Sequence, residues 1–236
     1  MTLMDSIVLA IKVDTENDWM TLAIFDLDNT LIGGDSDNLW GQYLYDQKLV
    51  DVTDFDQQNN QFYEHYKAGT LDIDAYLRFA LGPLKGRTRE VLDAWHKEFM
   101  RTVIEPIMLP KAEALIARHR ARGHTLLIIT ATNVFITRPI ADALGIENLL
   151  GCEAEIVDGL YTGNPAGVPS YREGKVTRLN AWLAETGESM DGATFYSDSH
   201  HDLALLELVT NPVAVDPDDQ LRARAVQADW PVMSLR

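Results

Sequence analysis

Three polar residues follow a short apolar stretch near the start of the chain. Residues 22–25 are apolar, which is typical of a buried strand, and Asp26, Asp28 and Thr30 come directly after them. Residues two apart in an extended chain project to the same side, so the two carboxylates would lie next to each other. Like charges that close repel unless they share a cation or a proton. The pattern predicts a divalent metal site with oxygen ligands, an acid–base pair, or both; a polar turn that ends the strand is the structural alternative.

Other polar residues stand where later apolar stretches end. Thr130 ends a stretch that begins at residue 125, Asp198 follows another, and Asp202 comes four residues later. Lys175 stands at the start of a helical pattern. Because ligands of a doubly wound sheet bind at the carboxyl ends of its strands, we expect these residues to meet at one edge.

The elements that must position these residues are of two kinds. Residues 36–105 carry apolar and aromatic side chains at three- and four-residue steps, which predicts four helices and no strand. From residue 106 onward, strands alternate with helices, and residues 164–173 are rich in proline and glycine, which predicts a loop. We expect an α/β fold: a doubly wound, Rossmann-like parallel-sheet core over residues 20–35 and 106–236, with residues 36–105 inserted as an α-helical domain.

Composition limits the partners. The 236 residues include 36 acidic and 20 basic ones, for a net charge of −16, which argues against a nucleic-acid or anionic membrane surface as partner. No apolar run approaches a membrane span, and one cysteine, Cys152, allows no intramolecular disulfide. We expect a cytoplasmic monomer or homodimer.

The first nineteen residues precede the organising strand and lack the basic start and apolar stretch of a signal peptide. We expect residues 1–19 to be an extension that is either disordered or the product of a mis-assigned start codon, with Met20 as the initiator.

The stretch Asp26-Leu27-Asp28-Asn29-Thr30 resembles the first motif of the haloacid dehalogenase superfamily, which is Asp-x-Asp-x-Thr after an apolar strand. The later motifs of that superfamily are a Ser or Thr, a Lys and an acidic pair, and Thr130, Lys175 and Asp198 with Asp202 match them in order. The helical insertion and the stretch 198–207 are similar to the phosphoserine-phosphatase-like subfamily. The whole chain also resembles bacterial histidinol-phosphate phosphatases.

The resemblance implies a Mg²⁺-dependent phosphatase that acts on a small phosphorylated metabolite through an aspartyl phosphate. Asp26 would be the nucleophile and Asp28 the acid and base, while Thr130 and Lys175 would donate hydrogen bonds to phosphoryl oxygens. The implied Mg²⁺ ligands are the side chains of Asp26 and Asp198 and the backbone carbonyl of Asp28. Asp202 would orient Lys175 or a metal-bound water. The other expected site residues are Thr30 beside the metal ligands, and Ala131, Thr132 and His201 near the substrate; relatives commonly carry Asn where this chain has His201.

The helical insertion resembles the cap of the subfamily, which reads the leaving group. The resemblance implies an acid for a substrate amine nine residues after the nucleophile, which is Asp35, and an arginine for a carboxylate at the position of Ala80. Arg78 is close, but two residues along a helix turn it about 200° away. An amino-alcohol phosphate without a carboxylate, such as histidinol phosphate, therefore fits better than phosphoserine.

Other functions stay open at this stage. They are a phosphoserine phosphatase, a phosphoryl transferase with the same aspartyl intermediate, and a phosphate-binding protein without catalysis. A receiver-type signalling domain is disfavoured, because it has no such helical insertion and places its acceptor aspartate away from the first strand.

Overall fold

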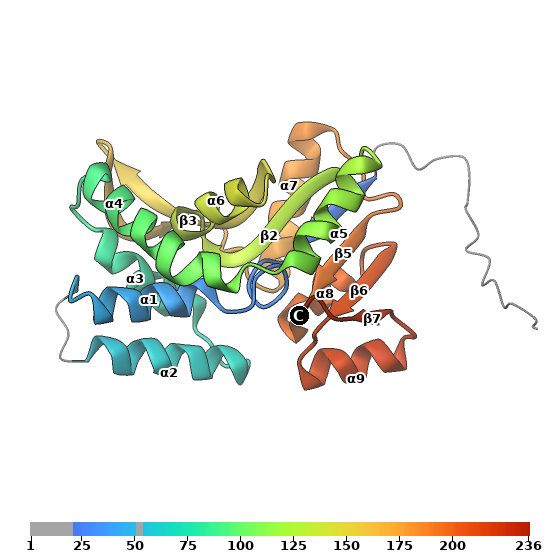
Figure 1. Cartoon of the computed structure of the whole chain (residues 1–236), viewed down its shortest axis with the longest axis horizontal. Coiled ribbons are helices and arrows are strands. Elements are labelled where there is room, and N and C mark those ends of the chain that lie inside the picture. Colours follow the sequence, from blue (N-terminus) through green and yellow to red (C-terminus); the bar gives the residue numbers. More distant parts are fainter. Residues whose placement is uncertain (1–20, 51–53) are drawn as a thin grey trace, which may run out of the picture.

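The computed structural model describes residues 21–50 and 54–236. The expected N-terminal extension, residues 1–19, lies outside this part of the chain. Within it, seven strands form one sheet in the order β4-β3-β2-β1-β5-β6-β7 (Figure 1). The strands are β1 (Leu22–Phe25), β2 (Thr125–Asn133), β3 (Asn148–Val157), β4 (Leu160–Ala166), β5 (Thr194–Ser197), β6 (Asn211–Val215) and β7 (Val232–Met233).

Nine α-helices accompany this sheet in the described residues. They are α1 (Ser36–Asp46), α2 (Phe55–Lys67), α3 (Ile73–Leu81), α4 (Arg89–Phe99), α5 (Pro110–Ala121), α6 (Val134–Ala143), α7 (Glu173–Thr186), α8 (Leu203–Leu206) and α9 (Asp219–Gln227). In the described residues no helix combines the length and the apolar character that crossing a membrane would require.

The central strand β1 is buried on both faces. Ala23 and Phe25 belong to the apolar cluster that α5 and α6 complete, whereas Leu22 and Ile24 belong to the cluster that α7, α8 and α9 complete. Because alternate residues of a strand point to opposite faces, helices cover both sides of the sheet. The fold is therefore the expected doubly wound α/β fold, with β1 paired in parallel to β2 on one side and to β5 on the other.

Two strand boundaries differ from the sequence prediction. The expected loop over residues 164–173 begins later, because β4 continues through Pro165 to Ala166. β4 is an edge strand that pairs only with β3, in antiparallel orientation, and an edge strand tolerates a residue without an N–H. β2 does not end at Thr130 but continues to Asn133, with a register shift against β3 between Ile129 and Asn133.

The four helices α1 to α4 lie between β1 and α5 in sequence and gather at one end of the molecule, opposite β7 and α9 (Figure 1). α1 and α2 approach each other closely at Gly41, where a Cβ atom would lie 2.4 Å from Oδ1 of Asn59. The amide of Asn59 donates a hydrogen bond to the carbonyl of Asn38 at 3.0 Å. We call residues 36–105 the cap below; its limits as a domain stay a prediction.

Candidate active site

The side chain of Lys175 lies between two buried carboxylates. It comes from the first turn of α7, and its Nζ atom donates to Oδ1 of Asp26 at 2.8 Å and to Oδ2 of Asp202 at 2.9 Å. The hydroxyl of Ser197, the last residue of β5, donates to the same Asp202 oxygen at 2.7 Å. Asp202 is thus fixed by a neighbouring strand and in turn fixes the lysine against Asp26.

Thr30 joins the ends of β1 and β5. Its Oγ1 atom lies 3.4 Å from Oδ2 of Asp26 and 3.2 Å from Oδ1 of Asp198. The same hydroxyl accepts a hydrogen bond from the backbone N–H of Asp198 at 3.1 Å. One buried threonine therefore holds the two carboxylates on either side of it.

The carboxylate of Asp28 is held from two elements at once. Its Oδ1 atom accepts from the backbone N–H of Ser36 at 2.6 Å, at the start of α1. Its Oδ2 atom accepts from Thr132 at 2.8 Å and lies 3.3 Å from the Thr130 hydroxyl. Both threonines lie in the irregular part of β2, and irregular strand pairing is frequent next to active sites because it re-aims side chains.

Burial dominates the electrostatics of this cluster. It raises the pKa of Asp26 to about 7; Lys175 acts against this rise, while Asp202 and Asp28 add to it. Burial and the charges of Asp26 and Asp202 raise the pKa of Asp198 well above its usual range, and burial also raises that of Asp28. Burial alone would lower the pKa of Lys175, but Asp202 and Asp26 outweigh it and the net shift is upward. The cluster thus holds more negative charge than one lysine can balance.

Asp26 and Asp198 fit a divalent cation. Their carboxylates converge on one hydroxyl, they are buried, and their mutual repulsion would be relieved by a positive ion between them. In residues 21–50 and 54–236, no three His, Cys, Asp or Glu side chains group closely enough to hold a metal. A Mg²⁺ site built from two carboxylates, a backbone carbonyl and water does not need a third such side chain.

A small cavity of about 40 Å³ opens beside Asp26 and Asp28. It lies between the strand ends and the cap, and its lining consists of Asp26, Asp28, Asp35, Asp37, Asn38, Asn59, Phe62, Tyr63, Tyr66, Ile73, Tyr76, Thr130, Ala131 and Thr132. A cavity of that size holds only a few waters. The space between the cap and the ends of the strands is therefore small in this arrangement.

Three of the expected substrate residues line this cavity and one does not. Asp35, Ala131 and Thr132 are part of its wall. Asp35 also caps α1, since its Oδ1 atom accepts from the backbone N–H groups of Asp37 and Asn38. His201 lies outside the lining, and its Nε2 atom is 2.7 Å from the backbone carbonyl of Tyr66 in the cap.

Several lining residues were missed by the sequence prediction, above all Asp37, Asn38 and Tyr76. Asp37 follows Asp35 at a spacing of two, the same spacing that singled out Asp26 and Asp28. That signal was available. Nothing in the sequence, however, indicated that Tyr76 of α3 packs beside the start of α1.

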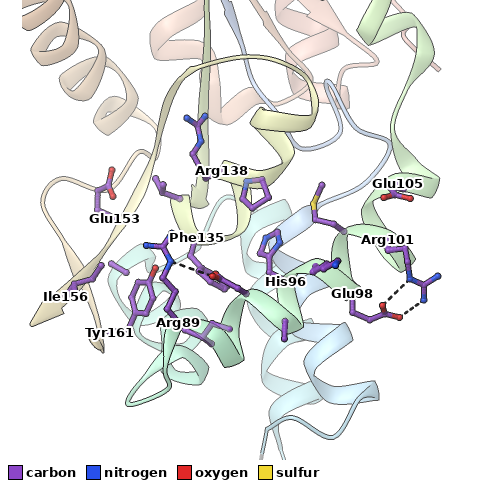
Figure 2. A pocket seen from close by; sticks show the side chains of 18 residues that line it. Arg89, His96, Glu98, Arg101, Glu105, Phe135, Arg138, Glu153, Ile156 and Tyr161 are labelled. Atoms are coloured by element: carbon purple, nitrogen blue, oxygen red, sulfur yellow. Dashed lines mark hydrogen bonds and ion pairs between the residues drawn. The ribbon is translucent and has the colours of Figure 1, made fainter. Parts of the chain in front are cut away.

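Size alone does not identify the site. A second cavity of about 790 Å³ lies between α4, α6 and the β3–β4 hairpin, and its lining includes none of Asp26, Asp28 and Asp198. Figure 2 shows that Arg101 and Glu98 pair at one end of this groove, with Glu153 and Ile156 at the other. It contains no lysine–carboxylate cluster like that around Lys175.

Comparison with known proteins agrees with this geometry. A histidinol-phosphatase of Neisseria meningitidis is 49% identical to this chain over 91% of this chain and 99% of the relative. The phosphoserine phosphatase SerB1 of Mycobacterium tuberculosis is 32% identical over 93% of this chain and 72% of the relative.

Solved structures share the fold. A Bordetella pertussis protein of unknown function superposes with a TM-score of 0.87 at 40% identity, covering 92% of this chain and 100% of that one. A phospho-aspartyl intermediate analogue of a phosphoserine phosphatase superposes with a TM-score of 0.68 at 16% identity, covering 92% and 94%. Residues 23–207 match the family of haloacid dehalogenase-like hydrolases, and this chain belongs to that family.

Proposed function

We propose that this phosphatase hydrolyses histidinol phosphate, with Mg²⁺ and through a phosphorylated Asp26. The proposal rests on the placement of Asp26, Asp28 and Lys175 for the chemistry, and on the acidic lining of the cavity for the substrate. The Neisseria meningitidis relative, which bears the name histidinol-phosphatase, supports the same substrate.

Asp26 is the nucleophile of the proposed reaction. Lys175 and Thr30 hold its two oxygens, so the carboxylate faces the phosphate in a fixed orientation. An oxygen of Asp26 bonds to phosphorus as the phosphorus–oxygen ester bond breaks. Mg²⁺ held by Asp26, Asp198 and the Asp28 carbonyl would supply positive charge against the phosphate.

Asp28 is the proton donor and acceptor. Burial raises its pKa, so the protonated form that a leaving alkoxide needs is accessible. After it gives this proton to the leaving oxygen, which departs as the alcohol, the carboxylate of Asp28 takes a proton from the water that attacks the aspartyl phosphate. Inorganic phosphate leaves and Asp26 returns as a carboxylate.

The single observation that carries the substrate assignment is the charge of the cavity wall. Four aspartates line the cavity, and its described lining contains no arginine or lysine. Arg78 is exposed and donates to the backbone carbonyl of Asp74, while Ala80 is buried. The wall therefore suits a substrate with cationic or N–H groups and offers nothing to the carboxylate of phosphoserine.

The test measures phosphate release with Mg²⁺ from histidinol phosphate, phosphoserine and an aryl phosphate. We expect histidinol phosphate to give the highest kcat/KM. Asp26→Asn should lower its kcat roughly 10²- to 10⁴-fold, because a positioned group that acts in the transition state is lost. Asp191→Asn, the same change at an exposed turn, is the matched control and should behave as wild type.

Each outcome separates two hypotheses. A preference for phosphoserine would overturn the substrate assignment and leave the mechanism standing. Transfer to added alcohols without free phosphate would indicate a phosphoryl transferase, and absence of turnover on all three esters would contradict the phosphatase itself. The aspartyl phosphate is tested by incubating the enzyme with a substrate whose phosphate is labelled and quenching the mixture in acid. We expect the label to stay bound to the wild-type protein and to be absent from Asp26→Asn.

A further inference from the structure

One carboxylate of the cavity wall takes no part in the proposed reaction. Asp37, in the first turn of α1, is 6% exposed and has no role in holding Asp26, Asp28 or Asp198. Its Oδ1 atom is buried and has no hydrogen-bond partner among the residues that the structure describes. A buried acceptor without a partner costs free energy, so its presence calls for a ligand or a structural reason.

Helix capping does not supply that reason. The N-cap of α1 is Asp35, whose carboxylate already accepts from the first free backbone N–H groups of the helix. Asp37 instead lines the cavity together with Tyr76 of α3, whose hydroxyl donates a hydrogen bond to the Asp37 carboxylate. Tyr76 holds the group in place and leaves Oδ1 unused.

A donor without a partner belongs to the same cavity lining. Asn38 is one of the lining residues, and its side-chain Nδ2 atom is buried and has no partner among the described residues. The cavity therefore presents one unused acceptor and one unused donor from consecutive residues. A neutral imidazole carries one N–H donor and one nitrogen acceptor, and it is the leaving-group feature that a plain amino alcohol lacks.

Aromatic side chains flank these two groups. Phe62, Tyr63 and Tyr66 of α2 line the same cavity, and a planar ring can pack against them. We propose that Asp37 and Asn38 form a subsite that binds the imidazole ring of the substrate, with Oδ1 of Asp37 accepting from a ring N–H. The inference rests on the proposed function, and it separates ring recognition from the recognition of the amine by Asp35.

The experiment compares two substrates that share an amine and a phosphate and differ in the ring: histidinol phosphate and alaninol phosphate. The readout is the ratio of their kcat/KM values. Asp37→Asn is nearly isosteric and replaces the charged carboxylate by a neutral amide, whose one carbonyl oxygen is a weaker acceptor for a ring N–H, and we expect it to lower this ratio by roughly 10- to 100-fold. Asp46→Asn removes the same charge from the exposed end of α1 and should leave the ratio as in wild type.

Two more variants keep the test decisive. Asp35→Asn should lower kcat/KM for both amines relative to an aryl phosphate and change the ring ratio little. Tyr76→Phe frees the carboxyl of Asp37 and should lower the ring ratio in the same direction, which covers the case that Asp37→Asn does not fold. An unchanged ratio in Asp37→Asn and Tyr76→Phe would overturn the subsite.

The failure of the proposed function would look different. Wild-type enzyme that prefers alaninol phosphate or phosphoserine to histidinol phosphate would contradict the substrate and the subsite together. Wild-type enzyme that prefers histidinol phosphate, with a ratio insensitive to Asp37 and Tyr76, would contradict the subsite alone.

Discussion

Lys175 is the residue on which the charge balance of the site depends. A buried cation with carboxylates at 2.8 Å and 2.7 Å is stable only while its partners are ionised and well placed. Because the two aspartates come from different parts of the chain, we expect removal of the lysine to affect folding as well as the proposed catalysis.

We expect Lys175→Met to destabilise the protein by about 3–5 kcal/mol, since two buried carboxylates lose their cation. Adding Asp202→Asn should recover part of that loss, because one of the unpaired charges is removed as well. Urea unfolding measures both changes, and Lys97→Met on the exposed face of α4 is the control. A double variant as unstable as the sum of the single changes would show that the three groups are not coupled.

Asp35 links stability to pH. Burial and the nearby charge of Asp28 raise its pKa from 3.8 to about 7 in the folded protein. Between these two values the folded state binds more protons than the unfolded state, so stability should fall as the pH rises.

We therefore expect the Tm of metal-free protein to decline between pH 5 and 8, and Asp35→Asn to show a smaller decline. Asparagine keeps the helix cap and cannot titrate in this range. Part of the decline of Tm with pH should persist in Asp35→Asn, because Asp26 also has a pKa raised to about 7.

Thermal melts in EDTA at several pH values measure the change of Tm with pH. Asp46→Asn, at the exposed end of α1, is the control. An equal change of Tm with pH in Asp35→Asn and in Asp46→Asn would exclude Asp35 as the cause.

The elements explain which parts of the site were predictable. Asp26, Lys175 and Asp198 stand at or near element ends, and a doubly wound topology brings such ends together. Thr130 also reaches the site, although β2 continues past it to Asn133. Asp37 of α1 and Tyr76 of α3 meet through a side-chain hydrogen bond between two helices far apart in sequence, which no local pattern reports. The extension of β4 past Pro165 was missed for a similar reason, since its place at the edge of the sheet is a property of the whole fold.

The contact between α1 and α2 should be sensitive to one methyl group. Gly41→Ala would place a Cβ atom 2.4 Å from Asn59, so Asn59 must leave its position against Asn38 and the cavity. We expect lower stability and a higher KM, even though alanine favours a helix by about 1 kcal/mol. Gly82→Ala, where nothing lies within 4 Å of the new Cβ atom, is the control for added bulk and should leave KM unchanged. Unchanged KM in Gly41→Ala would mean that the helices separate without disturbing the wall.

At the scale of the molecule, the cavity between the cap and the core is small, so we expect the cap to open and close over it in each turnover. Two core residues hold the cap where α2 ends. The guanidinium of Arg172 donates to the carbonyl of Gly69 at 2.7 Å and to Nδ1 of His201 at 3.3 Å, and His201 contacts the carbonyl of Tyr66. Burial is the main cause that lowers the pKa of His201 to about 4, so this contact uses the neutral imidazole at physiological pH.

Arg172 also has a φ of +50°, which is unfavourable for a residue with a side chain, so its contacts to the cap must outweigh that strain. Arg172→Ala keeps the strain and removes the contacts. We expect the closed state to lose population, KM to rise several-fold for every substrate, and amide hydrogen exchange of α2 to accelerate relative to α9. Arg222→Ala on the exposed face of α9 removes the same charge and should change neither quantity.

Two outcomes would contradict this role of Arg172. Faster amide exchange of α2 without a higher KM would mean that closure of the cap is not needed for substrate binding. A rise in KM that differs between substrates would place Arg172 in contact with the leaving group instead.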